Sequence, residues 1–172
     1  MIPRTLDSLL KTYHFPYRKM AFLAGPRQVG KTTLAKLLLK QRETTSLYYN
    51  WDNVRQKRLL LKDPYAFEKD IPITKERSLV VFDEIHKYPR WKNYLKGVFD
   101  QFGAELDFLV TGSGRLNIYK KGADSLVGRF FLYTLLPLSV GEISHHSLKN
   151  VNDLFKEFPS PTKHSSNVLI IC

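Results

Sequence analysis

Cysteine is almost absent from this sequence of 172 residues, in which Cys172 stands alone. A single cysteine excludes an intrachain disulfide framework and a cysteine-based zinc site. The five histidines do not occur with carboxylates at the spacing of a metal site. The sequence therefore predicts no permanently bound metal held by cysteine or histidine.

Long apolar runs are absent too, since none approaches the ~18 residues that a membrane-spanning helix needs. Residues 1–20 lack the continuous apolar segment of a signal peptide, because Asp7, Lys11, His14 and Arg18 interrupt it. We therefore expect a cytoplasmic protein that makes no contact with a membrane.

Acidic residues are scarce relative to basic ones: 16 Asp and Glu stand against 27 Lys and Arg, which gives a net charge of +11. Residues 1–50 contain nine basic and two acidic residues, whereas residues 101–172 contain seven and six. A basic N-terminal half is compatible with a DNA or protein partner, although charge alone does not identify one. The remaining composition, 43% hydrophobic and 25% charged, is typical of one globular domain.

One motif stands out among the residues that are present. Residues 25–32, GPRQVGKT, match the phosphate-binding loop pattern G-x-x-x-x-G-K-[ST] at every specified position. The apolar run 20–24 before the loop predicts a buried strand, and the leucine-rich residues 31–40 predict a helix. This context favours a nucleotide site made by Gly25, Pro26, Arg27, Gln28, Val29, Gly30, Lys31, Thr32 and Thr33.

The residue types of the loop suit a nucleoside triphosphate. Gly25 and Gly30 allow backbone conformations that other residues avoid and a close approach of the backbone to phosphate. The loop amides and the positive end of the following helix attract the anion. We expect Lys31 to bind the β- and γ-phosphates and the Thr32 hydroxyl to bind Mg²⁺.

A second motif lies at residues 78–84, SLVVFDE, where four apolar residues precede two acids. This pattern predicts a strand buried on both faces that delivers carboxylates to its C-terminal end, as in a Walker B segment. We expect Asp83 to hold the Mg²⁺ and Glu84 to activate the attacking water. A glutamate in this position, together with the lack of an Asn-Lys-x-Asp run, favours ATP over GTP.

Further candidate site residues follow in the second half of the chain. The apolar segment 105–110 predicts a strand that ends in Thr111-Gly112-Ser113, so Thr111 or Ser113 is a candidate sensor of the γ-phosphate. Arg129 is the candidate arginine finger, in its own site or in that of a neighbouring subunit, which would imply a homo-oligomer. Arg90 and Arg115 are alternatives for that role.

Local signals predict the remaining elements. Asp52 could orient water or a base in the site, but Asp52 or Asn53 is equally suited to cap a helix that Asp63-Pro64 ends. Ser139 with Glu142 forms a capping box. The predicted elements are helices near 5–13, 54–62, 91–102 and from 139 onward, and strands at 46–50 and 130–135.

With these motifs, the sequence resembles the prokaryotic AAA-like P-loop ATPases that usually carry a C-terminal domain of unknown function. The matching segments are GPRQVGKTTL (25–34), YYNWDN (48–53), LVVFDEIHKYPRWKNYLKGVFD (79–100), LVTGSGRLNIYKKGADSLVGRFF (109–131) and LLPLSVGE (135–142). The resemblance implies a three-layer α/β/α P-loop NTPase domain with a five-stranded, mainly parallel sheet of the ASCE type. In that sheet the Thr111 strand lies between the strands that precede Lys31 and end at Asp83.

The resemblance also sets the expected domain boundaries. We expect residues 1–145 to form the ATPase domain and residues 146–172 to be a linker or the truncated start of a missing C-terminal domain, since 143–172 lose the pattern.

The predicted function is an ATPase that hydrolyses Mg-ATP slowly when alone. The non-enzymatic alternative is a nucleotide-dependent switch or DNA-binding module with little or no hydrolysis. A small-molecule kinase would need an arginine-bearing lid and an acceptor pocket, and the sequence shows neither clearly.

Overall fold

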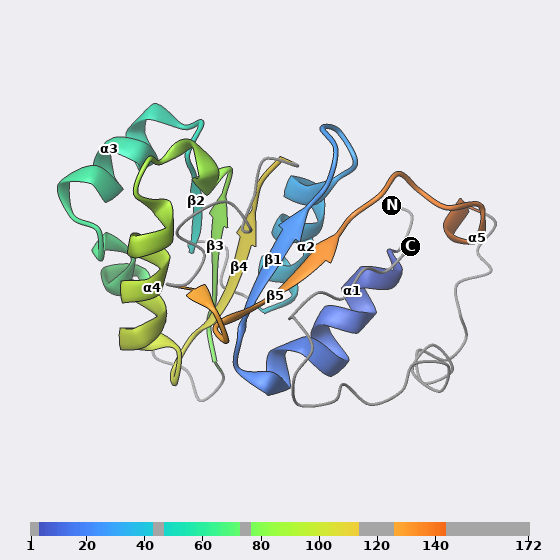
Figure 1. Cartoon of the computed structure of the whole chain (residues 1–172), viewed down its shortest axis with the longest axis horizontal. Coiled ribbons are helices and arrows are strands. Elements are labelled where there is room, and N and C mark those ends of the chain that lie inside the picture. Colours follow the sequence, from blue (N-terminus) through green and yellow to red (C-terminus); the bar gives the residue numbers. More distant parts are fainter. Residues whose placement is uncertain (1–3, 43–46, 73–76, 114–125, 144–172) are drawn as a thin grey trace.

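The computed structural model describes residues 4–42, 47–72, 77–113 and 126–143. Five strands form one sheet in the order β2-β3-β4-β1-β5, and every neighbouring pair is parallel (Figure 1). The strands are β1 (Met20–Ala24), β2 (Tyr48–Asn50), β3 (Leu79–Asp83), β4 (Asp107–Thr111) and β5 (Phe130–Thr134). This order confirms the expected fold class, with β4 between β1 and β3.

Helices and helical turns connect the strands. They are α1 (Thr5–Leu9), a π-helical turn η1 (Leu10–His14), 3₁₀ turns η2 (Phe15–Tyr17), η3 (Ala66–Asp70) and η4 (Ile85–Lys87), and α2 (Lys31–Gln41), α3 (Val54–Lys62), α4 (Trp91–Phe102) and α5 (Val140–Ile143). In the described part of the chain, no helix is both long enough and apolar enough to cross a membrane.

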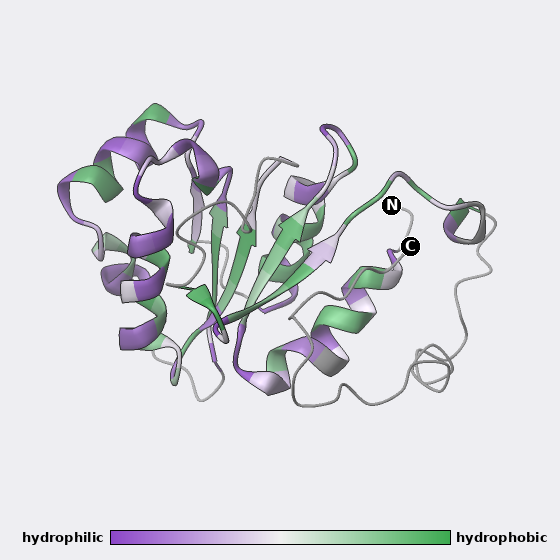
Figure 2. Cartoon of the chain, in the orientation of Figure 1, coloured by the Kyte–Doolittle hydropathy of each residue, from purple (hydrophilic) through white to green (hydrophobic). Residues whose placement is uncertain are grey.

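The two faces of the sheet are covered by different helices, which makes three layers (Figure 1). Neighbouring residues of a strand point to opposite faces, so Phe22 belongs to the core beneath α3 and α4, whereas Leu23 belongs to the core beneath α1 and α2. Figure 2 shows the hydrophobic strands in the middle and hydrophilic residues on the outer helices. Strands buried on both faces explain the apolar runs of the sequence.

Several local expectations are confirmed at the level of hydrogen bonds. Asn53, and not Asp52, caps α3, since its side chain accepts bonds from the backbone N–H groups of Arg55 and Gln56. Trp91 at the start of α4 is buried in the core, where its ring lies 6.1 Å from that of Phe22.

The capping box before α5 also forms. The Ser139 N–H donates to Glu142 Oε2 (3.0 Å), and the Glu142 N–H donates to Ser139 Oγ (3.2 Å).

Three predicted strand boundaries differ from the structure. β2 begins at Tyr48 and not at residue 46, and β5 ends at Thr134 and not at residue 135. β4 begins at Asp107 and not at residue 105, because the N–H groups of Glu105 and Leu106 donate to the Phe102 carbonyl and complete the end of α4.

Candidate functional site

The two motifs meet at one edge of the sheet. All five strands are parallel, so their C-terminal ends lie at the same edge. The register pairs Leu23 with Thr111 and Asn50 with Asp83. The loop after β1, the acidic end of β3 and the hydroxyl at the end of β4 therefore lie next to one another, where open parallel sheets bind ligands.

The phosphate-loop segment between β1 and α2 depends on three residues with positive φ: Gly25 (150°), Gln28 (64°) and Gly30 (96°). The positive φ of Gly30 is a backbone conformation that glycine adopts readily, as expected from the motif. Gly25 has a second reason, since a Cβ there would lie 2.2 Å from the Leu135 carbonyl oxygen. The close neighbour of Gly25 is thus the segment that follows β5.

Lys31 lies at the start of α2 with its side chain inside the loop. Its Nζ donates to the carbonyl oxygens of Gly25 (3.0 Å) and Pro26 (2.6 Å). Burial lowers the pKa of Lys31 below its ordinary value, while the Glu84 and Asp83 carboxylates oppose that shift. The ammonium is thus a buried cation whose charge the Glu84 and Asp83 carboxylates favour.

Asp83 is the centre of the site and is almost fully buried. The Thr32 hydroxyl donates to Asp83 Oδ2 at 2.8 Å, which joins the loop motif to the acidic motif. The hydroxyls of Thr111 and Tyr48 donate to Oδ1 and Oδ2 of the same carboxylate. A carboxylate and a hydroxyl at hydrogen-bond distance form a hard-oxygen donor pair that fits Mg²⁺.

Glu84 follows directly and has a left-handed backbone, with φ of 57°. Its N–H donates to Thr111 Oγ1 over 3.4 Å, and its Oε2 lies 3.7 Å from both His86 Nε2 and Lys87 Nζ. A left-handed conformation costs a non-glycine residue about 1–2 kcal/mol, and such strain gathers at functional sites.

The two candidate sensors have different surroundings. Thr111 is completely buried and bonded to Asp83, whereas Ser113 Oγ lies 3.3 Å from His86 Nε2 beside Glu84. Both lie at the edge that carries the two motifs.

Arg129 lies far from this edge in its own chain. It precedes β5, so it lies at the N-terminal edge of the sheet, where its guanidinium forms an ion pair with Asp100 (2.7 Å). The structure therefore does not bring Arg129 to the loop of the same molecule. Arg90 lies exposed before α4, and Arg115 is outside the described residues.

Arg4 is a site neighbour that the sequence pattern did not indicate. Its guanidinium donates to the carbonyl oxygens of Val29 in the loop (3.1 Å) and of Leu136 (2.6 Å), and to the Glu142 carboxylate (3.1 Å). No motif carries this signal, because the partners are 25 to 138 positions away in the sequence.

A hollow of about 470 Å³ opens beside the loop, between Arg4, the outer side of α2 and the segment after β5. Apolar side chains make much of its wall, among them Val29, Leu37, Pro137 and Leu138.

The positive charge of the N-terminal half is partly used inside the fold. Arg4 and Arg42 form ion pairs with the buried carboxylates of Glu142 and Asp107, and Lys31 lies inside the loop. Arg4 and Arg42 are therefore already paired with carboxylates of the same chain.

Comparisons with known proteins agree with this geometry. A family model described as an AAA domain matches residues 17–144. The solved structure of the Aeropyrum pernix ORC1 protein in complex with DNA is similar, with a TM-score of 0.55 and 15% identity over 82% of this chain and 46% of that chain. At this identity the likeness shows the fold alone, and this chain spans less than half of that protein.

Proposed function

The chain belongs to the AAA domain family, and from this membership and the site geometry we propose that it binds Mg-ATP and hydrolyses it. One observation carries the proposal: the bond of 2.8 Å between Thr32 Oγ1 and Asp83 Oδ2 joins the phosphate loop to the acidic end of β3. In P-loop ATPases these two side chains serve the same metal ion beside the same triphosphate.

The loop residues 25–33 would hold the phosphates, with Lys31 as the charged contact. The apolar hollow beside the loop would take the nucleoside end, since it begins at Val29 and continues along α2 to Leu37. Arg4 supports both parts, because it bonds the Val29 carbonyl and lies in the wall of the hollow.

Thr32 and Asp83 would hold the Mg²⁺, which, when bound, neutralises charge on the phosphates. Glu84 is the proposed base that takes a proton from the attacking water. Its position directly after Asp83, its side-chain exposure of 22% and its neighbours His86 and Lys87 support this role. Ser113 is the better placed candidate for a γ-phosphate sensor, because the Thr111 hydroxyl is buried against Asp83.

The proposal is tested by ATP binding and turnover of two variants. Lys31→Ala should lose ATP binding, because the buried cation in the loop is removed. Glu84→Gln should keep binding but lose about 10²- to 10⁴-fold in turnover, because the amide cannot accept the proton. Binding is measured by calorimetry and turnover by phosphate release.

Lys40→Ala is the matched control, since Lys40 is an exposed lysine on the same helix as Lys31. It should bind and hydrolyse ATP as the unsubstituted chain does. Equal turnover by Glu84→Gln would remove Glu84 from the mechanism. Phosphate release without a phosphorylated acceptor separates hydrolysis from kinase activity.

The alternative function is a nucleotide-dependent switch or DNA-binding module. The similarity to a protein solved in complex with DNA gives this alternative a specific test. Turnover and binding are measured with and without duplex DNA at several salt concentrations. Tight ATP binding without turnover, together with salt-sensitive DNA binding, would favour the switch.

A further inference from the structure

We infer that Tyr48 is a positioning residue for the metal-binding carboxylate of Asp83. By orienting this carboxylate, its hydroxyl lets Mg²⁺ strengthen nucleotide binding. This inference rests on the proposed function and extends it to a residue of the edge strand β2. The functional site drawn from the two motifs contains Thr32 and Asp83, and neither motif includes Tyr48.

The contacts of Tyr48 lead to Asp83. The register of β2 and β3 places Tyr48 beside Val81, two residues before Asp83 on the same face of the sheet. From there its hydroxyl donates to Asp83 Oδ2, while Asn50 Nδ2 lies 3.5 Å from the Tyr48 oxygen. The amide of Asn50 occupies the acceptor side of the hydroxyl, which directs the phenolic proton toward the carboxylate.

The ring of Tyr48 is held in place by α2. The side chain is half-buried among the core residues beneath α1 and α2, and Lys36 Nζ lies 5.2 Å from the ring centroid. Lys36 and Thr32 are four residues apart on α2, so one face of this helix contacts the ring of Tyr48 and Asp83.

Three hydroxyls therefore donate to one carboxylate, but their roles differ. Thr32 is the proposed metal ligand, so its hydroxyl oxygen would also bind Mg²⁺. Tyr48 donates to Oδ2 and Thr111 donates to Oδ1, so these two hydroxyls fix both oxygens of Asp83 independently of Thr32. Groups that orient a metal-binding carboxylate affect metal affinity even though they do not touch the metal.

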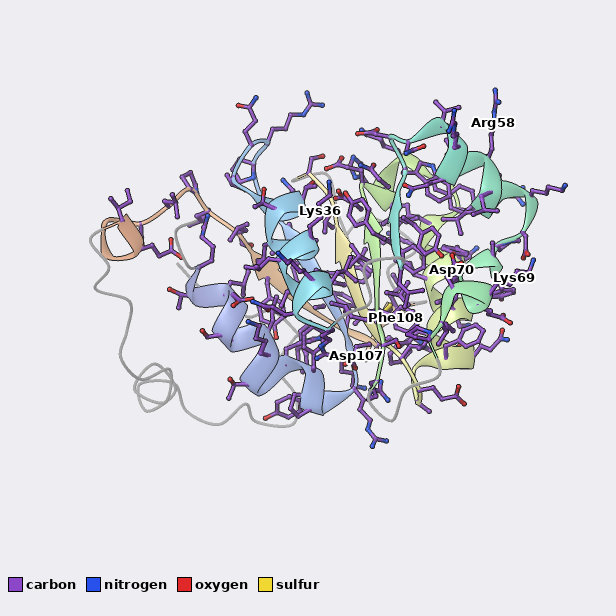
Figure 3. The ribbon with its side chains drawn as sticks, turned by 180° about the vertical axis from the view of Figure 1, so that it is seen from behind. Lys36, Arg58, Lys69, Asp70, Asp107 and Phe108 are labelled. Atoms are coloured by element: carbon purple, nitrogen blue, oxygen red, sulfur yellow. The ribbon has the colours of Figure 1, made fainter. Side chains whose placement is uncertain are left out.

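The next residue provides a matched control. Tyr49 also donates its hydroxyl to a carboxylate, Asp70 Oδ2 at 2.7 Å, but it points to the opposite face of the sheet. Figure 3 labels Lys36 on α2 and Asp70 on η3, the partners of the two tyrosines. Tyr48→Phe and Tyr49→Phe thus remove the same group from adjacent positions, and each leaves a carboxylate without one donor.

The test measures the affinity of the full chain for a non-hydrolysable ATP analogue, by calorimetry, in EDTA and over a series of Mg²⁺ concentrations. We expect Tyr48→Phe to match the unsubstituted chain in EDTA and to need at least about tenfold more Mg²⁺ for half of the maximal gain in affinity. Tyr49→Phe should keep the original Mg²⁺ dependence. Thermal melting of both variants shows whether each remains folded.

The outcomes separate this inference from the proposed function. If the unsubstituted chain gains no affinity from Mg²⁺, both fail. If it does and Tyr48→Phe keeps the same or a lower Mg²⁺ requirement, only the role of Tyr48 is overturned. An equal shift in Tyr49→Phe would also overturn it, because the effect would then come from general loss of stability and not from Asp83.

Discussion

His14 is a buried titratable residue that the proposed mechanism does not use. Its Nε2 lies 2.9 Å from the Lys19 carbonyl and its Nδ1 lies 2.8 Å from the Tyr133 hydroxyl. The carbonyl can only accept, so Nε2 carries the proton and Nδ1 accepts from Tyr133. Burial lowers the pKa of His14 from 6.5 to about 4, although the Lys19 bond and the Asp107 charge oppose that shift. The side chain therefore links η1 to β5 as a neutral base.

This burial predicts a pH-dependent stability. The unfolded chain binds a proton at His14 below pH 6.5 and the folded chain does so only near pH 4, so stability is present above pH 6.5 and is lost as the pH falls to 4. The loss amounts to at most about 3 kcal/mol in the free energy of unfolding.

Urea denaturation between pH 4 and 7 measures this dependence. We expect His14→Gln to be less stable at pH 7 and to lose less further stability on acidification, because its side chain does not titrate. An identical slope in both proteins would mean that His14 is already charged in the fold or that other groups dominate.

At the scale of elements, one arginine joins three segments that are distant in the sequence. Arg4, just before α1, bonds the phosphate loop, the segment after β5 and Glu142 of α5. Burial alone would raise the pKa of Glu142, but hydrogen bonds from Ser139 and Thr5 and the charge of Arg4 hold it below its usual range. The short helix α5 is therefore attached to α1 by a charged contact that is only slightly exposed.

We expect Arg4→Ala to lower the free energy of unfolding by about 2–4 kcal/mol, because it leaves the Glu142 carboxylate without its cation. Arg129→Ala is the control, since its ion pair with Asp100 is exposed and such pairs contribute less than about 1 kcal/mol. Denaturation midpoints in urea at pH 7 compare the two. A loss of stability of similar size in both variants would contradict the expectation that the less exposed ion pair contributes more.

At the scale of the whole molecule, the basic residues of the N-terminal half are divided between internal contacts and exposed positions. Several N-terminal cations lie in internal contacts, whereas Arg55, Lys57, Arg58 and Lys62 of α3 are exposed and form no ion pair among the described residues. Figure 3 labels Arg58 on this helix. Arg129 likewise lies at the sheet edge opposite to the nucleotide site of its own chain.

This placement predicts that Arg129→Ala leaves ATP turnover per chain unchanged at concentrations where the protein is monomeric. The measurement is phosphate release over a series of protein concentrations, with the assembly state followed by light scattering. A loss of turnover that appears only as the chains associate would place Arg129 in the site of a neighbouring subunit.

The sequence alone determined the fold class and the chemical motifs of this protein. Local backbone geometry accounts for the glycine positions and the Lys31-Thr32 pair of the phosphate loop. Burial accounts for the apolar run that ends in Asp83. These are properties of neighbouring residues, so a pattern over eight or ten positions contains them. Resemblance to a known family then supplied the strand order, which local patterns do not contain.

Only the tertiary structure decided which distant residues meet. It brings together residues that are far apart in the chain: Tyr48 with Asp83, Arg4 with Val29, and Gly25 with Leu135. It also keeps Arg129 away from the phosphate loop. The cause is sheet order and register, which depend on how all five strands and the two helical layers pack together. No short segment of the sequence encodes that packing by itself.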